Sequence, residues 1–400
     1  MIPATWGMCR DGQLGRGQIC VLYSNVREEL PAKVNILLVE PYFTGSHRAW
    51  ALGYAARSRH EVRLVSHPGR WWKWRMRGSA LTLARSLAEL EGWQPDLILV
   101  SDMVDLAQLR SFARPFVGEV PTILYFHESQ LTYPTSDGNE PDLSYALTNW
   151  LSAWAADQVL FNSGYHRDVF FQALPPLLRN FPDLTHEHLI GEVAARSEVL
   201  PVGVDLSWIE ERGARNDIAR ILWNHRWDQD KGPDSFAGGI ERLVEARLDF
   251  ELVLLGSRPP HPPPALTRIR AMAGDRITHD GEAPLDIYRH LVSTCDVVAS
   301  TALQEFFGVS VVEAVAAGCR PVLPDALSYP WLIPDSFHEA VLYEDGGLVE
   351  GLIQALADPV PPAGLSSSMA RYSWDRLAGI YDERLSTIAT RSDIAGPASG

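Results

Sequence analysis

The sequence predicts an α/β protein made of two doubly wound, Rossmann-like domains that face each other across a cleft. Short apolar runs alternate with longer helical segments along the chain, which is typical of parallel sheets with helical crossovers. Most of these runs are continuous in Val, Ile and Leu, as in strands that are buried on both faces. The series starts again after a polar stretch at residues 207–217, so we expect each half of the chain to form its own sheet.

Six short apolar runs in each half of the chain are the expected strands. In the first half they are residues 35–40, 61–67, 96–102, 121–127, 158–163 and 198–203. In the second half they are residues 220–225, 250–256, 277–281, 296–301, 320–325 and 340–345. A chain of 400 residues has room for two domains of ordinary size. We expect one over residues 34–205 and the other over residues 217–358.

The two ends of the chain do not fit this alternation. Residues 1–33 are Gly-rich and polar with one weak apolar run, and we expect them to be disordered or a non-native extension. Residues 359–400 are expected to form a C-terminal helix followed by a disordered tail, which begins after Ser386.

The composition indicates a soluble globular protein and argues against several other classes. Hydrophobic residues make up 46% of the chain and charged residues 21%, and no apolar window is long enough to span a membrane. The N-terminus lacks the pattern of a secretion signal. Four cysteines without a Cys-x-x-Cys pair suit a reducing cytoplasm and give no support for zinc. No Gly-x-Gly-x-x-Gly follows a strand, so a nicotinamide site is not supported.

The charge is distributed unevenly along the chain. The formal net charge of −15 argues against a protein that coats nucleic acid through its overall charge. Residues 48–85, however, hold nine Lys or Arg and a single acid, Glu61. A concentrated basic stretch in an acidic protein favours a local site for a polyanion, although a solvated helix face would have the same composition.

Polar residues follow several of the expected strands at the point where each strand ends. In doubly wound sheets, ligands bind at the carboxyl ends of the strands. The unusual residues at these positions in the first half are Gly45, Ser46, His47, His127, Glu128 and Asn162. Those of the second half are Arg226, Lys231 and residues 304–308. We therefore expect a ligand to be held between the two domains.

Arg226 and Lys231 are two cations in one loop after a strand, and such a pair can neutralise a diphosphate. An ordinary surface loop with ion pairs would also contain them. Asp228 and Asp230 form an Asp-x-Asp pattern that could hold Mg²⁺. The neighbouring cations and the lack of a third carboxylate nearby favour a metal-independent site, so no metal is expected.

Glu305 and Glu313 lie on either side of the start of an expected helix over residues 308–318. The free N–H groups and the dipole at a helix N-terminus favour a phosphate there. Glu305 is placed for sugar hydroxyls, and Glu313 can accept hydrogen bonds from a ribose diol, unless it only caps or solvates the helix. A carboxylate beside a bound anion needs hydroxyls between them, which favours a nucleotide sugar over a bare phosphate.

This segment resembles a known family. Residues 305–323 (EFFGVSVVEAVAAGCRPVL) are similar to the Glu-x7-Glu region of family 4 glycosyltransferases, which have the two-domain GT-B fold. The pair of cations in the preceding loop agrees with that family. The resemblance implies that Arg226 and Lys231 hold the donor diphosphate, that Glu305 contacts the donor sugar, and that Glu313 contacts the nucleotide ribose.

The resemblance also implies roles for residues in the first half. Gly45 would allow the first loop to approach the diphosphate, and His127 would lie at the catalytic centre. The expected donor site is completed by Ser46, Phe306, Phe307 and Gly308. Members of this family retain the anomeric configuration and usually need no metal.

The first half is more similar still to one group, the tRNA-queuosine mannosyltransferases. The similar segments are residues 36–50, 71–86, 124–134 and 159–163. The resemblance implies transfer of mannose from GDP-mannose to queuosine at the wobble position of a tRNA, for which tRNA-Asp is expected. It implies acceptor contacts by His47, Glu128, Gln130 and Asn162. The chain departs from the group in having HESQ at residues 127–130, where HENQ is expected.

The same resemblance accounts for the basic stretch. The expected RNA contacts alternate cations with indoles and are Arg70, Trp71, Trp72, Lys73, Trp74, Arg75 and Arg77. Cations neutralise RNA phosphates, and indoles stack on splayed anticodon bases. The alternative is that these tryptophans belong to the core, and we expect that at least one of them does.

The expected mechanism is front-face substitution, in which Arg226, Lys231 and the helix N-terminus stabilise the leaving nucleoside diphosphate. The departing phosphate would take the proton, and His127 would position the sugar or acceptor. Other interpretations are a transferase of the same fold that acts on a lipid, glycan or small molecule, and a catalytically silent RNA-binding protein. A nucleotide-sugar epimerase is a weaker interpretation, because it would not need the basic aromatic stretch. A cytoplasmic protein without a membrane partner is expected.

Overall fold

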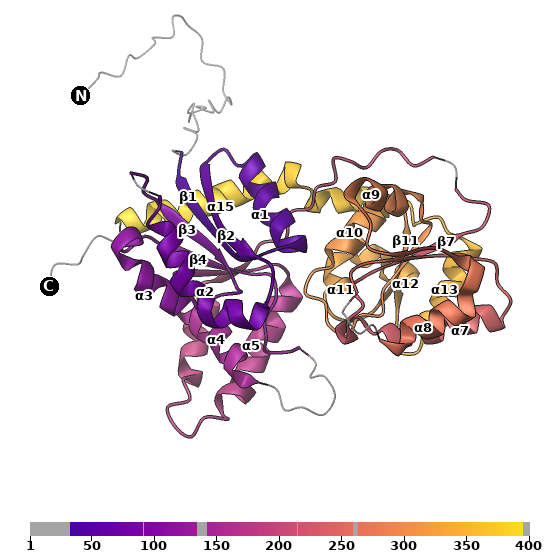
Figure 1. Cartoon of the computed structure of the whole chain (residues 1–400), viewed down its shortest axis with the longest axis horizontal. Coiled ribbons are helices and arrows are strands. Elements are labelled where there is room, and N and C mark those ends of the chain that lie inside the picture. Colours follow the sequence, from indigo (N-terminus) through magenta and orange to yellow (C-terminus); the bar gives the residue numbers. More distant parts are fainter. Residues whose placement is uncertain (1–32, 91, 134–141, 214, 259–262, 395–400) are drawn as a thin grey trace, which may run out of the picture. The chain divides into compact units, whose positions relative to one another are not determined.

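The structure is a computed structural model that describes residues 33–394, apart from residues 91, 134–141, 214 and 259–262. The expectations for residues 1–32 and 395–400 lie outside the described residues. The described chain forms two parallel sheets of six strands each, which confirms the predicted fold class of two doubly wound α/β domains (Figure 1).

The N-terminal domain is built on a sheet in the order β2-β1-β3-β4-β5-β6, with every neighbouring pair parallel. Its strands are β1 (Asn35–Phe43), β2 (Glu61–Pro68), β3 (Leu97–Ser101), β4 (Thr122–Phe126), β5 (Gln158–Phe161) and β6 (Ser197–Val199). Its main helices are α1 (Gly45–Arg57), α2 (Trp72–Leu87), α3 (Leu106–Val117), α4 (Leu143–Ala155), α5 (Gly164–Leu178) and α6 (Ile190–Ala195). Successive residues of β1 enter opposite hydrophobic clusters, Ile36 and Leu38 on one face and Leu37 and Val39 on the other. Both faces of this sheet are therefore covered, as its unbroken apolar runs predict.

The C-terminal domain is built on a sheet in the order β12-β11-β10-β7-β8-β9, again parallel. Its strands are β7 (Arg220–Asn224), β8 (Glu251–Leu255), β9 (Ile277–Gly281), β10 (Val297–Ala299), β11 (Arg320–Pro324) and β12 (Leu342–Tyr343). Its helices include α7 (Pro233–Glu245), α8 (Pro264–Ala273), α9 (Leu285–Thr294), α10 (Val309–Ala316), α11 (Tyr329–Leu332), α12 (His338–Val341) and α13 (Leu348–Ala357). Each of these twelve strands overlaps one of the twelve runs expected from the sequence, although β6, β10 and β12 are shorter than expected.

The strand order places two sites for ligands. In each sheet the chain first adds strands on one side and then crosses to the other, so the order reverses between β1 and β3 and between β7 and β10. Ligands bind at the carboxyl ends of strands beside such a reversal. The pairing of β1 with β2 is irregular between Glu40 and Phe43, at this edge, and such bulges redirect side chains near active sites.

The helix α15 (Trp374–Ile394) follows the C-terminal domain but belongs to the core of the N-terminal one. It lies along β1 and β3 in Figure 1. Trp50 Nε1 donates to Tyr381 Oη (3.1 Å), and Tyr54 Oη donates to Asp382 Oδ1 (2.9 Å). All four of these side chains are buried.

The helix continues past Ser386, where we expected the disordered tail to begin. Ile388 and Ala389 are buried on it, and the Ser386 hydroxyl bonds back to the Asp382 carbonyl (2.7 Å). The expectation was wrong at this point because the apolar contacts of these residues come from the distant first domain. A local pattern could not reveal them.

Candidate active site

The first half of the site begins in the loop that joins β1 to α1. The backbone N–H of Tyr42 donates to Glu40 Oε1 (2.8 Å), which fixes the strand end. Gly45, the first residue of α1, has a left-handed φ of +48°, and a Cβ there would meet no atom within 4 Å. Backbone conformation, and not crowding, therefore favours glycine here. The exposed Ser46 follows it, and contact of both residues with a diphosphate stays a prediction.

Three buried side chains, Glu40, His47 and His127, form the centre of this half. His47 Nδ1 lies 3.3 Å from each carboxylate oxygen of Glu40, and the rings of His47 and His127 have centroids 4.2 Å apart. Burial alone would lower the pKa of His47, but the Glu40 carboxylate raises it to about 9. Burial and the neighbouring His47 hold the pKa of His127 well below its ordinary range. At neutral pH, a charged His47 therefore lies against a neutral His127.

These three side chains are also the group to examine for a metal ion. Their ligand atoms lie within 4.8 Å of one another, and a zinc ion would need each of them at about 2.0–2.2 Å. Such an ion would have to displace the contact between Glu40 and His47 and deprotonate His47. We assign no metal to this group.

The backbone of His127 is held on both sides. Its N–H donates to Asp102 Oδ1 (2.8 Å), and its carbonyl accepts from Asn162 Nδ2 (2.8 Å). Asn162 Oδ1 in turn lies 2.9 Å from His166 Nδ1. Burial raises the pKa of Asp102 to about 8, against the opposing effect of His47. Asn162 thus supports His127 in this structure, and its contact with an acceptor stays a prediction.

Glu128 and Gln130 follow His127 and reach toward the C-terminal domain. Glu128 accepts from Gln130 Nε2 (3.2 Å) and from the hydroxyl of Tyr133 (2.9 Å). The Tyr133 ring meets Phe306 of the C-terminal domain edge-on, with centroids 6.0 Å apart. Burial and the Glu128 carboxylate raise the pKa of Tyr133 well above its ordinary value. The hydroxyl therefore stays a donor.

The second half of the site contains both predicted cations. Lys231 is buried, and its Nζ donates to the Gln304 carbonyl (2.7 Å) and to Glu305 Oε2 (3.2 Å). Arg226 is more exposed and pairs with Asp228 (3.3 Å) and Asp230 (3.6 Å). Burial would lower the pKa of Lys231, but Glu305 and Asp230 raise it above its ordinary value. The loop thus keeps two cations at the end of β7, with the Asp-x-Asp carboxylates already paired to them.

Glu305 begins the segment that follows β10. Burial would raise its pKa, but Lys231 lowers it below the ordinary value, so the carboxylate stays charged. Phe306 stacks on His166 of the N-terminal domain, with ring centroids 3.9 Å apart, and its carbonyl accepts from the Ser163 hydroxyl (2.6 Å). The side chains of Phe306 and Phe307 are both buried in contacts within the protein. Their part in donor binding stays a prediction.

Gly308 and Glu313 belong to α10, which is two residues shorter at its C-terminal end than we expected. Gly308 caps this helix with a left-handed φ of +101°. Glu313 Oε2 accepts from the Tyr288 hydroxyl (2.6 Å), which itself accepts from Asn224 Nδ2 (2.8 Å). Burial raises the pKa of Glu313 to about 7. This carboxyl is held in place by a network and does not merely solvate the helix.

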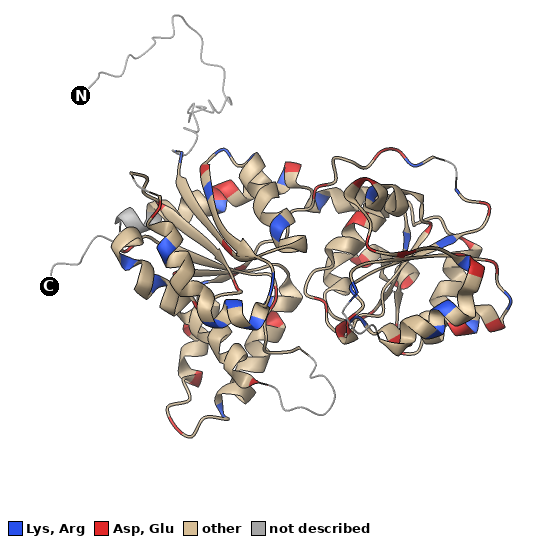
Figure 2. Cartoon of the chain, in the orientation of Figure 1, with Lys and Arg blue, Asp and Glu red and all other residues tan. Residues whose placement is uncertain are grey.

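The basic aromatic segment, residues 70–77, forms the start of α2, where Figure 2 shows Lys and Arg along the helix. Trp71 and Trp74 are 77% and 64% exposed, and Trp71 has an unusual left-handed φ of 57°. Trp72 instead lies against Tyr145, with ring centroids 5.1 Å apart, and Arg77 lies over that same tyrosine ring. The exposed cations of this segment are Arg70, Lys73 and Arg77, while Arg75 is half-buried and donates to the Pro68 carbonyl (3.2 Å). Strained backbone of this kind is found mainly at functional sites.

Four residues of the site were missed by sequence reasoning: Glu40, Asp102, Tyr133 and Tyr288. Glu40 and Asp102 end expected strands, and a carboxylate at the end of an apolar run is the pattern that could have revealed them. The tyrosines gave no such pattern, because their partners are brought to them by the fold.

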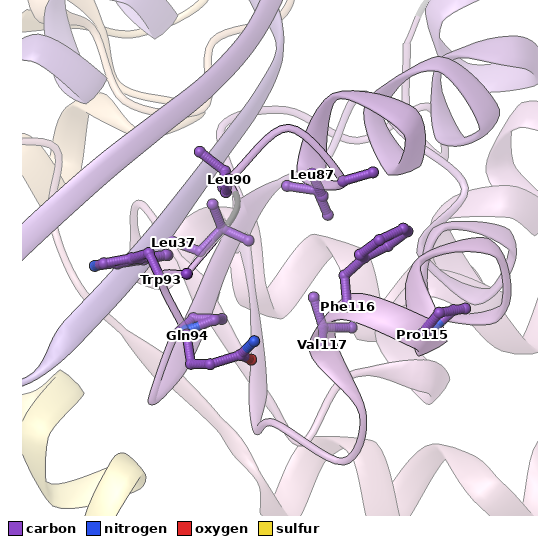
Figure 3. Close-up of a pocket in the computed structure, with 11 residues that line it drawn as sticks. Leu37, Leu87, Leu90, Trp93, Gln94, Pro115, Phe116 and Val117 are labelled. Atoms are coloured by element: carbon purple, nitrogen blue, oxygen red, sulfur yellow. The ribbon is translucent and has the colours of Figure 1, made fainter.

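A cavity of about 290 Å³ lies elsewhere, beneath the N-terminal sheet. Figure 3 shows its lining side chains, among them Leu37, Trp93 and Phe116. Leu37 is near the start of β1 and Gln94 and Pro95 precede β3, so this cavity is at the opposite edge of the sheet from His127. None of its described lining residues is titratable, and it does not contribute to the candidate site.

Two family models match the chain. Residues 35–204 match the model described as tRNA-queuosine alpha-mannosyltransferase N-terminal, and residues 218–358 match glycosyl transferases group 1. The chain is 31% identical over 314 residues to the tRNA-queuosine alpha-mannosyltransferase of Drosophila melanogaster, which covers 76% of this chain and 82% of that protein. It is 25% identical over 210 residues to a GDP-mannose:cellobiosyl-diphosphopolyprenol alpha-mannosyltransferase of Xanthomonas oryzae, covering 48% and 54% of the two chains.

Solved structures share the fold at low identity. The catalytic domain of starch synthase IV from Arabidopsis thaliana has a TM-score of 0.67 at 12% identity, covering 90% of this chain and all of that one. The Anabaena HepE structure in complex with UDP and glucose has a TM-score of 0.62 at 16% identity, covering 88% and 100%. These similarities show the GT-B fold expected from the sequence. Among the described residues, no helix has the length and apolar character needed to span a membrane.

Proposed function

We propose that this chain, which belongs to the tRNA-queuosine alpha-mannosyltransferase family, transfers mannose from GDP-mannose to queuosine at the wobble position of a tRNA, with retention of configuration. The observation that supports this best is the meeting of two sets of residues. Arg226, Lys231 and Glu305 follow strands of one sheet, and Tyr133, bonded to Glu128 of the other sheet, contacts Phe306. A donor site and an acceptor site thus adjoin.

On the donor side, Arg226 is the cation with the freer side chain. Its guanidinium is half-exposed and held by two carboxylates at 3.3 and 3.6 Å, long enough for a diphosphate to compete for it. Lys231 is fixed against Glu305, so we assign Lys231 to the phosphate nearest the sugar and Glu305 to the sugar hydroxyls. Glu313 would accept from the ribose diol in place of the Tyr288 hydroxyl.

On the acceptor side, we assign residues 34–205 to tRNA and residues 217–358 to the donor. The exposed indoles of Trp71 and Trp74 offer faces for unpaired bases of the anticodon loop, since stacking of this kind is how single-stranded RNA is commonly bound. The cations between them would neutralise phosphates. Trp72, which lies against Tyr145, would support this surface and not stack on RNA. Because the acceptor is a tRNA, we place the protein in the cytoplasm, where its buried free thiols Cys295 and Cys319 stay reduced.

The mechanism that fits these residues is front-face substitution. The bond between the anomeric carbon and the diphosphate oxygen breaks, and the acceptor oxygen bonds to the same face of that carbon. Arg226, Lys231 and the N-terminus of α10 stabilise the negative charge on the leaving diphosphate. The diphosphate takes the proton of the acceptor hydroxyl, so no protein base is required. His127, neutral at the carboxyl end of β4, orients a hydroxyl.

The test is nucleoside mass spectrometry of queuosine-containing tRNA after incubation with purified protein and GDP-mannose. The expected product is queuosine heavier by one hexose. UDP-glucose in place of GDP-mannose is the matched donor control, and tRNA carrying guanine at the wobble position is the acceptor control. Bound tRNA with unchanged queuosine would contradict the donor assignment. If the tRNA were neither bound nor modified, that result would contradict an RNA acceptor and favour a lipid or glycan acceptor.

A further inference from the structure

The group of Glu40, His47 and His127 contains an unusual charge arrangement in the N-terminal domain. Glu40 is fully buried and His47 is 6% exposed. Glu40 Oε1 also accepts from the backbone N–H of Tyr42. A buried carboxylate is stable only when it is paired and hydrogen-bonded, and His47 supplies the matching charge at 3.3 Å. The pair is therefore a fixed part of the fold and not a surface contact.

The ring of His127 is packed among three other aromatic rings, one of them that of His47. Trp50 meets the ring edge-on at 4.6 Å and Tyr125 lies at 4.8 Å, while His47 lies at 4.2 Å. His127 Nε2 is buried and has no hydrogen-bond partner. A buried polar atom without a partner calls for an explanation, and at a reaction centre a hydrogen bond to a ligand is one.

The charges around the two histidines explain why His127 is uncharged. The Glu40 carboxylate, at 3.3 Å, is the main group that holds His47 as a cation, whereas Asp102, with a pKa raised to about 8 by burial, is largely protonated at neutral pH. His127 faces His47 and His166, and burial together with that cation opposes a second proton. The neighbouring His166 is itself neutral, because burial holds its pKa well below the ordinary range. The only cation next to His127 among the described residues is thus His47.

On the basis of the proposed function, we propose that Glu40 and His47 are positioning residues for His127. The ion pair holds the His127 ring in place and uncharged, so that its Nε2 hydrogen-bonds a hydroxyl of the transferring sugar or of the acceptor. A neutral ring matters because positive charge develops on the sugar as the diphosphate leaves, and a second cation there would oppose it. In this role Glu40 and His47 need not touch either substrate, so it replaces the acceptor contact that the resemblance implies for His47.

The experiment compares three variants: His47→Gln, Glu40→Gln and the double variant. In His47→Gln the cation that opposes protonation of His127 is lost, while the Tyr42 N–H and the introduced amide still donate to the Glu40 carboxylate, so the pKa of His127 rises. The acid limb of the pH–kcat profile then moves to higher pH by about one unit. On the acid side of the profile, kcat of the variant is therefore about tenfold lower than that of the wild-type protein. In the double variant that anion is gone, so the limb moves back toward the wild-type position. Removing a second residue thus restores activity.

His60→Gln is the matched control, because His60 is also 6% exposed and lies in the same domain, but bonds to the Val34 N–H and the Asp382 carbonyl. It should leave the acid limb where it is. A double variant no better than the worse single variant, or identical acid limbs in all variants, would overturn the proposal. Metal bound in equimolar amount to the purified protein, measured by mass spectrometry, would overturn it too.

A second measurement is independent of catalysis. Imidazole ¹⁵N NMR of the wild-type protein at pH 7 should show one buried histidine protonated on both nitrogens and lost in His47→Gln, and a neutral one lost in His127→Gln. A protonated His127 would refute the assignment even if no variant folded well enough for kinetics. If the wild-type protein transferred no hexose, the proposed function would fail, whereas the state of the pair would still be read from the NMR spectrum.

Discussion

The two halves of the candidate active site hold their charges in opposite ways. In the N-terminal half the charges are internal, because Glu40 and His47 neutralise each other while His127 presents an uncharged ring. In the C-terminal half, Arg226 extends from a loop and is only loosely paired. A leaving diphosphate is therefore attracted toward one side only. The comparison indicates that the direction in which the leaving group departs is set by where the fold leaves a cation available.

The largest effect is expected from removing that cationic side. Arg226→Ala combined with Lys231→Ala should abolish transfer, because removing a single such stabilising group commonly costs about 100- to 1000-fold in kcat. Affinity for tRNA should not change, as measured by filter binding. Arg268→Ala is the control, since Arg268 pairs with Asp234 on the surface of the same domain. Loss of tRNA binding together with transfer would show that donor and acceptor domains are misassigned.

The next effect concerns the exposed indoles of α2. Trp71→Ala and Trp74→Ala should each weaken tRNA binding by about 5- to 160-fold, because base stacking is worth about 1–3 kcal/mol per base. KM for GDP-mannose should stay the same. Trp154→Ala provides the comparison. Trp154 lies on α4 and is also partly exposed, but its ring is covered by the guanidinium of Arg196. Equal losses in all three variants would mean that α2 is not the RNA surface.

A smaller effect is expected at the contact between the halves. Ser163 accepts from the His166 N–H at the start of α5 and donates to the Phe306 carbonyl. Ser163→Ala should lower the free energy of unfolding by about 2 kcal/mol, through the lost cap and the unpaired carbonyl. Urea denaturation measures it. Ser86→Ala, which removes an exposed hydroxyl on α2, should change the stability little, and equal losses in both variants would contradict the contact.

The smallest effect is a pH dependence of donor binding. Burial raises the pKa of Glu313 to about 7, so this group ionises as the pH rises from 6 to 8. The carboxylate accepts hydrogen bonds from ribose hydroxyls better than the neutral acid does, so KM for the donor should fall about fivefold over this range, as for one charge-assisted hydrogen bond. Glu313→Gln should abolish the trend. If the pH dependence of KM persisted in Glu313→Gln, it would have to come from another titratable group.

The sequence predicted the fold and the donor half of the site more fully than the acceptor half. Arg226 and Lys231 occupy one loop, and Glu305 and Glu313 one short segment, so their chemistry could be inferred locally. Glu40 and His47 are also close in the chain, but Glu40 reads as the last residue of an apolar strand. Its role depends on His127, which only the order of β1, β3 and β4 brings to it.

The basic aromatic segment shows a different limit. Its composition predicted an RNA surface, but not which indoles face solvent. Trp71 is turned outward by a left-handed backbone that tryptophan rarely adopts, while Trp72 is held inward by Tyr145 from α4. The first depends on local strain and the second on a partner far along the chain, and neither is visible in residue spacing.

The position of α15 has a consequence for how the protein is made. Trp50 and Tyr54 are covered by Tyr381 and Asp382, so the core of the domain translated first is completed by a segment translated last. During synthesis on the ribosome, the early domain therefore waits with an apolar face uncovered until the C-terminal helix emerges. A nascent chain that stops before Trp374 would expose this face to chaperones and proteases, and the cell could thereby distinguish incomplete chains from finished ones.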